Sequence, residues 1–344
     1  MSEAKAIREP TLEPNLDVLR AFAVLAVYVG HLLQTLHVGG DWIHDLAQTG
    51  VIIFFVHTSL VLLMSLERTR QPRARLLVHF YVRRVFRIYP LSIVTVVGML
   101  LLSAPAFPNQ QFTPLTQLEL SANLGLFQNL VGARSYPDPL WSLPFEVQMY
   151  GVLPALFWFA QHRGEKAVWL LLTISCAAVL LAKAAGLVLL GQLLVYVPCF
   201  LAGVLSFVRR SHHPRLAWWL WPPWLVALVG LKAIVQHSGI PAAALWSPWV
   251  TAVALGWSMN AFSSCPHNWL ASLGALVSKY SYGLYLLQIV ALWCAFDATS
   301  GPFAVQFFVC IAMSVALPVL AFHAVEKPMM DLGRRVASAL SRPG

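Results

Sequence analysis

The first apolar stretch of the chain, residues 16–36, reads LDVLRAFAVLAVYVGHLLQTL. It can cross a bilayer, because a membrane helix needs about 20 mostly apolar residues. The stretch is too long for the apolar part of a signal peptide and has no small-residue cleavage site, so we expect it to remain as a membrane helix. It nevertheless contains Arg20 and His31. Ionisable groups are costly in lipid, so this pair indicates a functional site.

The rest of the chain repeats this apolar pattern. Its 344 residues are 58% hydrophobic and 11% charged, whereas a soluble domain carries roughly 25% charged residues. The short alternating segments of a membrane barrel are absent. We therefore predict an all-α polytopic membrane protein of about ten transmembrane helices with both ends cytoplasmic. The predicted helices are residues 16–36, 46–65, 77–103, 142–160, 167–184, 186–208, 218–236, 243–262, 280–297 and 302–325.

The cytoplasmic placement of the ends comes from the basic residues, which gather in every second loop. Basic residues lie between the second and third predicted helices, after the fourth and sixth, before the ninth, where the residue is Lys279, and after the tenth. The alternate loops hold only Arg134, Lys183 and Lys232. By the positive-inside rule, the first set of loops faces the cytoplasm. The net charge of +9 is thus a topology signal, with membrane lipids as the counter-charge and no need for a nucleic-acid partner.

The whole chain, residues 1–344, is predicted to form a single membrane domain. Its longest segment outside the membrane is an outer loop at residues 104–141, rich in Pro, Asn and Gln. Loops of this length are either lids and binding loops or simple connectors, and both readings stay open. The five cysteines form no CxxC pair, and we expect neither a disulfide nor a metal.

Polar residues inside the predicted helices are the candidate site. Arg20 and His31 are eleven residues apart, so both lie on one face of their helix, separated by about 16 Å along its axis. This spacing places Arg20 near the cytoplasmic side and His31 in the outer half. The alternatives are a snorkelling arginine and a histidine that only packs.

Arg84 and Arg87 lie at the cytoplasmic start of the third predicted helix. At this i,i+3 spacing they can converge on one ligand, and arginine suits bidentate recognition of phosphate. Some of the basic residues at this helix start are explained by the positive-inside rule alone, as charges that flank a membrane helix on its cytoplasmic side. Glu146 lies just after Pro144 in the first turn of the fourth predicted helix, at a depth expected to match that of His31. It either orients and charge-stabilises the histidine or caps the helix dipole.

The motifs in this order resemble the acyltransferase family 3 membrane enzymes over nearly the whole chain. The resemblance rests on residues 16–21 with His31, residues 54–56, 84–90 and 140–143 with Glu146 and Tyr150, residues 281–286 and residues 326–328. The chain departs from the family pattern at Val18, where glycine is usual, at residues 57–59, and at Gln288, where many members have histidine.

The resemblance implies transfer of an acyl group, usually acetyl, from cytoplasmic acyl-CoA to a hydroxyl of a sugar or glycan. It implies catalysis by His31, Glu146 and Arg20, with His31 as general base or as acyl-carrying nucleophile, and donor binding by Arg84, Arg87 and Arg20. Weaker candidates for substrate contact are His57, Trp141, Ser142, Tyr150, Tyr285 and Gln288. The implied partners are acyl-CoA (acetyl-CoA) and a glycan or lipid-linked sugar, and the implied location is the bacterial cytoplasmic (inner) membrane.

A flippase or transporter of lipid-linked sugars is the competing interpretation, because helices with buried charges suit it as well. The sequence shows no internal repeat and no paired helix breaks of the kind that many transporters have. Release of free CoA thiol from an acyl-CoA discriminates between the two functions.

Overall fold

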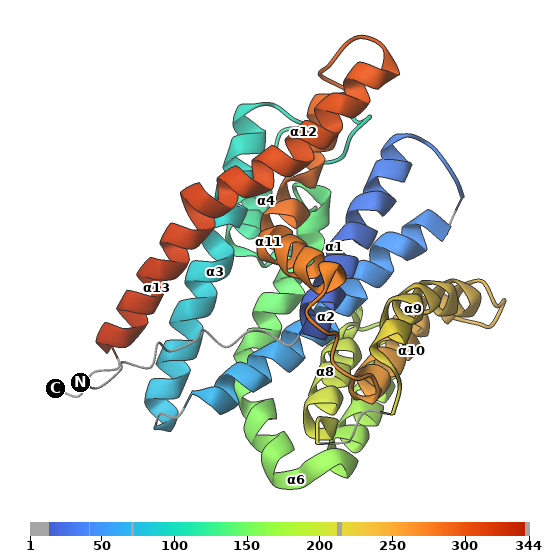
Figure 1. Ribbon diagram of the computed structural model, residues 1–344, viewed down its shortest axis with the longest axis vertical. Helices are drawn as coiled ribbons and strands as arrows, with labels where there is room; N and C mark the ends of the chain where they lie inside the picture. The colour runs from blue at the N-terminus through green and yellow to red at the C-terminus, as the bar shows by residue number, and fades with distance from the viewer. Residues whose placement is uncertain (1–13, 41, 70–71, 212–214, 341–344) are drawn as a thin grey trace.

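The structure is a computed structural model that describes residues 14–40, 42–69, 72–211 and 215–340. Apart from one isolated β-bridge between Leu216 and Phe262, regular structure in these residues is helical (Figure 1). The all-α prediction is therefore confirmed. The longer helices are α1 (Pro14–Thr35), α2 (Trp42–Arg68), α3 (Arg73–Leu101), α6 (Leu143–Ala184), α8 (Val197–Arg209), α9 (Trp221–Gln236), α10 (Ala243–Ser258), α11 (Trp269–Phe296), α12 (Phe303–Ala321) and α13 (Lys327–Leu340).

Short helical pieces connect these helices. They are α4 (Gln117–Gly125), α5 (Gln128–Val131) and α7 (Val188–Leu194), the 3-10 turns η1 (Asp138–Ser142), η2 (Trp218–Leu220) and η3 (Met259–Ala261), and the π-helical turn η4 (Phe322–Glu326). The predicted outer loop therefore contains α4, α5 and η1. The turn η1 leads directly into α6, and η4 joins α12 to α13 without a break.

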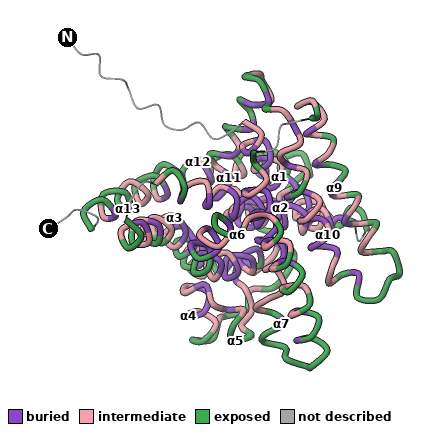
Figure 2. Tube along the Cα trace, turned by 90° about the horizontal axis from the view of Figure 1, so that it is seen from below, coloured by how far each residue is buried: buried purple, intermediate pink, exposed green. Residues whose placement is uncertain are grey.

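The centre of the molecule is formed by α1, α2 and α11. Helix α1 packs on both α2 and α11, while α2 also packs on α8, and α8 packs on α6 and α10. The tube in Figure 2 shows the buried residues gathered around α2, α6 and α11, whereas α13 is largely exposed or half-buried. Helix α13 packs along α3. The polar residues of the candidate site lie in this central group of helices and in α3.

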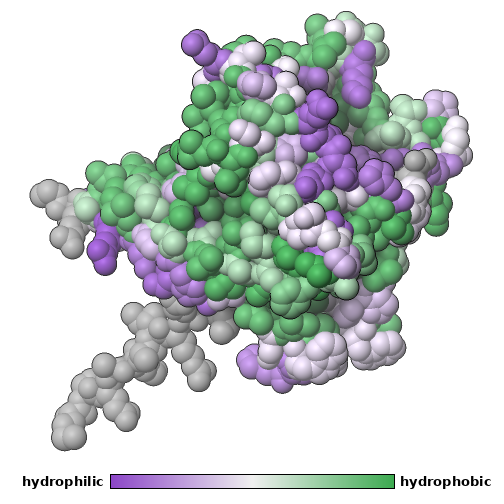
Figure 3. Space-filling model, turned by 90° about the horizontal axis from the view of Figure 1, so that it is seen from above, coloured by the Kyte–Doolittle hydropathy of each residue, from purple (hydrophilic) through white to green (hydrophobic). Residues whose placement is uncertain are grey.

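Many outward-facing side chains are apolar, as expected for a protein surrounded by lipid. Ile234 is 72% exposed and Phe308 is 73% exposed, and hydrophobic residues cover much of the face seen in Figure 3. By length and composition, eight helical segments within the described residues are able to cross a membrane. The chain is thus a polytopic membrane protein.

Two local features explain why the structure has eight such segments where ten were predicted. The predicted helices 142–160 and 167–184 are both part of α6, which bends at Gly164. That residue has φ 70° and ψ −168°, a conformation open essentially to glycine alone. Helix α10 has only 16 residues, fewer than the roughly 20 that a bilayer requires. The count of ten crossings and the cytoplasmic location of both ends remain predictions.

Two predicted helix boundaries were wrong. Helix α11 begins at Trp269, eleven residues before the predicted start at 280, because the Asn268 side chain caps it by accepting a hydrogen bond from the Ala271 N–H at 3.0 Å. Lys279 therefore lies inside a helix rather than before one. At the other end of the chain, the helical path continues through η4 and α13 instead of ending at 325.

Glycine allows the inner helices to approach one another closely. A Cβ atom on Gly203 of α8 would lie 2.2 Å from the carbonyl oxygen of Val56 on α2. One on Gly256 of α10 would lie 2.2 Å from the carbonyl oxygen of Ala202 on α8. Small residues at such positions are typical of packed membrane helices.

Candidate active site

One cavity collects most of the polar residues predicted from the sequence, and we call it the arginine cavity. It has about 760 Å³ of empty space, its open mouth included. Five helices and the turn η1 supply its lining. Its polar lining residues are Arg20, His57, Thr58, Arg84, Arg87, Ser142, Glu146, Tyr150, Ser281, Tyr282 and Tyr285.

Arg20 on α1 reaches across to α11, where its Nε donates a hydrogen bond to the hydroxyl of Ser281 at 2.7 Å. Arg84 and Arg87 on α3 line the same cavity. The Nε atom of Arg84 is buried and has no hydrogen-bond partner. The structure therefore brings together three arginines that are up to 67 residues apart, and it leaves one guanidinium N–H free to bind a ligand.

Arg87 is held by residues of η4 and α13. Its Nη1 lies 3.6 Å from the carboxylate Oε2 of Glu326 and donates to the sulfur of Met330 at 2.8 Å. The guanidinium also lies over the ring of Tyr282, at 5.7 Å from its centroid. Glu326 is buried, and neither of its oxygens has a hydrogen-bond partner. Arg87 is thus positioned by the Glu326 carboxylate and the Tyr282 ring, and the rest of its guanidinium is available to a ligand.

Glu146 lies in the arginine cavity and not with His31, contrary to the expectation that it orients the histidine. Its Oε1 accepts hydrogen bonds from the hydroxyl of Tyr150 and, at 3.4 Å, from that of Thr58. The reason is the turn η1, which occupies the chain just before α6. Helical structure thus begins at Asp138, before the Pro144 signal, and Glu146 lies further along the segment.

His31 lines a second cavity, which we call the histidine cavity. The lining consists of His31, Gln34, His44, Ala47, Gln48, Val51, Asp138, Trp141, Tyr196 and Tyr285. The Nδ1 atom of His31 is buried and has no hydrogen-bond partner. Gln288 lies beside the imidazole, and the ring of Phe107 meets it edge-on at 5.6 Å between centroids. The unpartnered nitrogen is available to a bound molecule.

The two cavities share two lining residues, Val51 on α2 and Tyr285 on α11. Tyr285 is buried, and its hydroxyl donates to the carbonyl oxygen of Pro139 at 2.8 Å. Because that uses its only proton, the Ser142 hydroxyl, 2.6 Å away, donates to the tyrosine oxygen. The cavities are therefore neighbours that meet at Val51 and at the fixed side chain of Tyr285.

The outer loop contacts His31 of the histidine cavity through the ring of Phe107. Asn109 ties this part of the loop to the ends of α1 and α11: its side chain donates to the Thr35 carbonyl at 2.8 Å, and its backbone N–H to Asp297 at 2.9 Å. Further along, η1 is joined to the same part of the loop, because the Asp138 N–H donates to the carbonyl of Ala106 at 3.0 Å.

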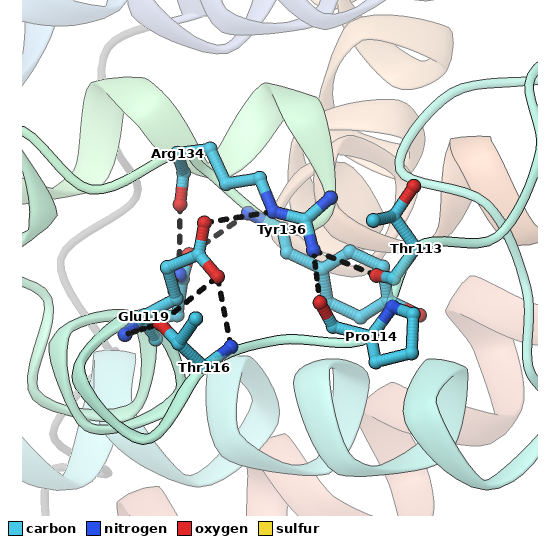
Figure 4. A network of polar contacts seen from close by, with 7 residues as sticks. Thr113, Pro114, Thr116, Glu119, Arg134 and Tyr136 are labelled. Carbon is cyan, nitrogen blue, oxygen red and sulfur yellow. Dashed lines mark hydrogen bonds and ion pairs between the residues drawn. The ribbon is translucent and has the colours of Figure 1, made fainter.

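A polar network orders the remainder of the loop (Figure 4). Arg134 donates to Glu119 at 2.9 Å and to the carbonyls of Thr113 and Pro114. Glu119 and Thr116 form a reciprocal capping box at the start of α4. These hydrogen bonds lower the pKa of Glu119, and the one from the Thr116 backbone N–H has the largest effect. The loop is thus ordered by hydrogen bonds, and its last residues supply Asp138 and Trp141 to the histidine cavity.

Of the remaining predicted residues, His57 and Trp141 each line one cavity, whereas Gln288 is in neither lining. His57 is buried in the arginine cavity with its Nε2 unpartnered, and Trp141 lies in the histidine cavity. Gln288 donates to the Tyr285 carbonyl at 2.8 Å, and its Oε1 has no hydrogen-bond partner.

Sequence reasoning missed five residues of the histidine cavity that carry polar atoms, namely Gln34, His44, Gln48, Asp138 and Tyr196. Asp138 stands directly before the Pro139–Tyr150 motif, between Pro137 and Pro139. An acidic residue beside prolines at a predicted helix start is a signal that would have found it. The other four lie near the end of α1, at the start of α2 and directly before α8, and they give no comparable signal.

Comparison with known proteins supplies the family. Residues 13–323 match the family 3 acyltransferase model, described as an acyltransferase domain. A search of curated proteins and a search of solved structures each found no match. The match covers far more than half of the chain and includes both cavities, and so this membrane protein belongs to acyltransferase family 3 and is an acyltransferase.

Proposed function

We propose that the protein transfers an acyl group, in particular acetyl, from cytoplasmic acyl-CoA to a hydroxyl of a sugar or glycan at a bacterial inner membrane. The observation that carries the proposal is the direct contact between two cavities of different chemistry. One contains three arginines suited to an anionic donor, and the other contains a histidine with a free buried nitrogen.

The arginine cavity suits the phosphate-bearing donor. Arg84 and Arg87 are neighbours on α3, which starts in the most basic part of the chain. The arginine guanidinium binds phosphate through bidentate hydrogen bonds. The unpartnered Nε of Arg84 is a donor to which a phosphate oxygen can bind. A buried N–H without a partner costs free energy, and a phosphate oxygen that accepts from the Arg84 Nε offsets this cost.

The histidine cavity suits the acceptor. Gln34, Gln48 and Asp138 offer hydrogen bonds to hydroxyl groups, while Trp141 and Tyr196 offer aromatic surface. A few placed polar groups among aromatic side chains are typical of small-molecule sites. The indole and phenol rings pack against the apolar faces of a sugar, and the carboxylate of Asp138 accepts from its hydroxyls.

His31 then acts as the general base. Gln288 lies beside the imidazole with its Oε1 free to accept a hydrogen bond, so in the proposed reaction Nε2 carries the ring proton and Nδ1 is unprotonated. Nδ1 takes the proton of the acceptor hydroxyl as its oxygen attacks the thioester carbonyl. The carbon–sulfur bond breaks, the proton passes to the thiolate, and the products are an ester and free CoA. In the alternative relay, His31 itself first carries the acyl group.

Release of CoA thiol by purified protein in detergent tests the proposal. With acetyl-CoA and methyl glycosides of common hexoses, the wild type releases thiol, and mass spectrometry detects the acetylated sugar. His31→Ala abolishes both signals, while His162→Ala, an exposed histidine on α6, retains them. Full activity of His31→Ala contradicts the role of the histidine. Absence of thiol release with every acyl-CoA contradicts the donor assignment.

A covalent intermediate separates the two chemical routes. Protein incubated with radiolabelled acetyl-CoA without acceptor is denatured and analysed for label. Label that disappears in His31→Ala indicates the relay, whereas unlabelled active protein indicates direct transfer.

A further inference from the structure

We propose that Val51 and Tyr285 frame the port through which the acyl group passes from donor to acceptor cavity, and that Val51 limits the length of the acyl chain. The inference rests on the proposed function, since it assigns the donor to the arginine cavity and the acceptor to the histidine cavity.

The face of α2 shows where the port lies. His44, Ala47 and Gln48 line the histidine cavity, and the residues from Phe54 onward line the arginine cavity. Val51 lies between these two groups, one helical turn from each, and lines both cavities. One face of α2 thus lines both cavities, and Val51 is the position at which the lining passes from one cavity to the other.

Tyr285 forms the opposite side of the port. It is the other residue common to both linings, and it lies on α11. Its hydroxyl is bonded to Pro139 and Ser142, and its ring meets that of Phe54 edge-on at 5.8 Å between centroids. Three contacts hold the ring in one orientation, so the width of the port is set by packing rather than by a side chain that swings.

A port of fixed width discriminates by size. The thioester carbonyl must meet the acceptor hydroxyl at the boundary between the cavities, so the chain attached to it lies between Val51 and Tyr285. One additional methylene in a tight apolar site changes enzyme selectivity by roughly 10–200-fold. Val51 is the residue whose volume changes this space without removing a hydrogen bond.

The test measures kcat/KM for acetyl-, propionyl- and butyryl-CoA by thiol release. We expect Val51→Ala to raise the butyryl-to-acetyl ratio by about 10-fold and Val51→Leu to lower the propionyl-to-acetyl ratio by a similar factor. Val61→Ala is the matched control, because Val61 is on the same helix and lines only the arginine cavity. Its chain-length preference should remain that of the wild type.

Tyr285→Phe tests the fixed ring separately. It keeps the ring but removes both hydroxyl contacts, and we expect a broader chain-length preference with more hydrolysis of acyl-CoA without acceptor. Unfolding temperature and gel filtration identify any variant that does not fold.

The outcomes separate this inference from the proposed function. If the wild type is active but Val51→Ala keeps its preference, or Val61→Ala shifts it equally, the port is overturned and the proposed function stands. If Tyr285→Phe retains the wild-type preference, the fixed ring is not what sets the width. If the wild type releases no thiol from any acyl-CoA, the proposed function fails.

Discussion

Lys232 on α9 donates a hydrogen bond to Asp45 on α2 over 2.6 Å, and both side chains are completely buried. The same ammonium donates to Gln236 at 2.6 Å, and the second oxygen of Asp45 lies 2.9 Å from Nε2 of His237. The pair therefore fixes α9 against the first turns of α2. These turns also carry His44 and Gln48, which line the histidine cavity.

Breaking this pair on one side should be strongly destabilising. Lys232→Met leaves the Asp45 carboxylate buried without its cation, and such losses amount to about 3–5 kcal/mol. We expect a clear fall in unfolding temperature in detergent. The double variant Lys232→Met/Asp45→Leu should recover much of it, because both charges are then gone. Lys183→Met removes an exposed lysine and is the control; an equal loss there contradicts the explanation.

Lys232 also illustrates what the sequence was able to predict. Patterns within one helix were informative: the apolar stretches located the helices, and the spacing of Arg84 and Arg87 placed both in one cavity. Pairings between distant segments were not. Lys232 was counted with a loop in the charge pattern, although the predicted helix 218–236 contains it, and it lies inside α9. Its partner is 187 residues away, and nothing local to either residue indicates the other.

The candidate site was predicted in the same uneven way. Arg20 and His31 were identified from their spacing on one helix, but Glu146 was placed beside the wrong residue. Its depth depends on η1, a 3-10 turn whose proline-rich sequence resembled the end of a loop. Asp138, at the start of that turn, is the carboxylate that lines the cavity of His31. Depth along a membrane helix follows from where the helix begins, and helix ends are difficult to predict.

Arg84 should contribute to donor binding while its neighbour Arg83 should not. Arg84→Ala removes the arginine whose Nε is buried and unpartnered in the cavity. A hydrogen bond to a charged group contributes roughly 1.5–3 kcal/mol, so we expect the KM for acetyl-CoA to rise by one to two orders of magnitude. Arg83→Ala, which removes equal charge outside the cavity lining, should leave this KM nearly unchanged. Equal effects of both variants would indicate general attraction by the basic cluster.

Glycine is required where α8 crosses α2. In Gly203→Ala the added methyl would lie 2.2 Å from the Val56 carbonyl oxygen, so the helices must separate, at a cost of about 1–3 kcal/mol. Gly98 on α3 has nothing within 4 Å of the same methyl, and Gly98→Ala should be neutral or stabilising because alanine favours helices. Thermal unfolding of the two variants in detergent gives the comparison. Equal unfolding temperatures would contradict the close approach.

The outer loop should loosen in acid because of Glu119. Its pKa in the folded protein lies below the usual value of 4.5, first because of the hydrogen bond from the Thr116 backbone N–H and then because of the Thr116 side chain and Arg134. A lowered folded pKa means that the stabilisation is fully present above 4.5 and is lost as the pH falls through the lower folded value.

Hydrogen–deuterium exchange of residues 117–136 measures this loss, corrected for the intrinsic pH dependence of exchange. The wild-type loop should be protected at neutral pH and lose protection only when the pH falls below 4.5, the usual pKa of a glutamate. Glu119→Gln keeps a side chain that suits the capping box but loses the charge facing Arg134, so its protection should be lower at neutral pH and change little with acid. Glu67→Gln removes a different ion pair, that with Arg210, and should leave the acid response of the loop intact. An acid response that persists in Glu119→Gln would assign the titration to another group.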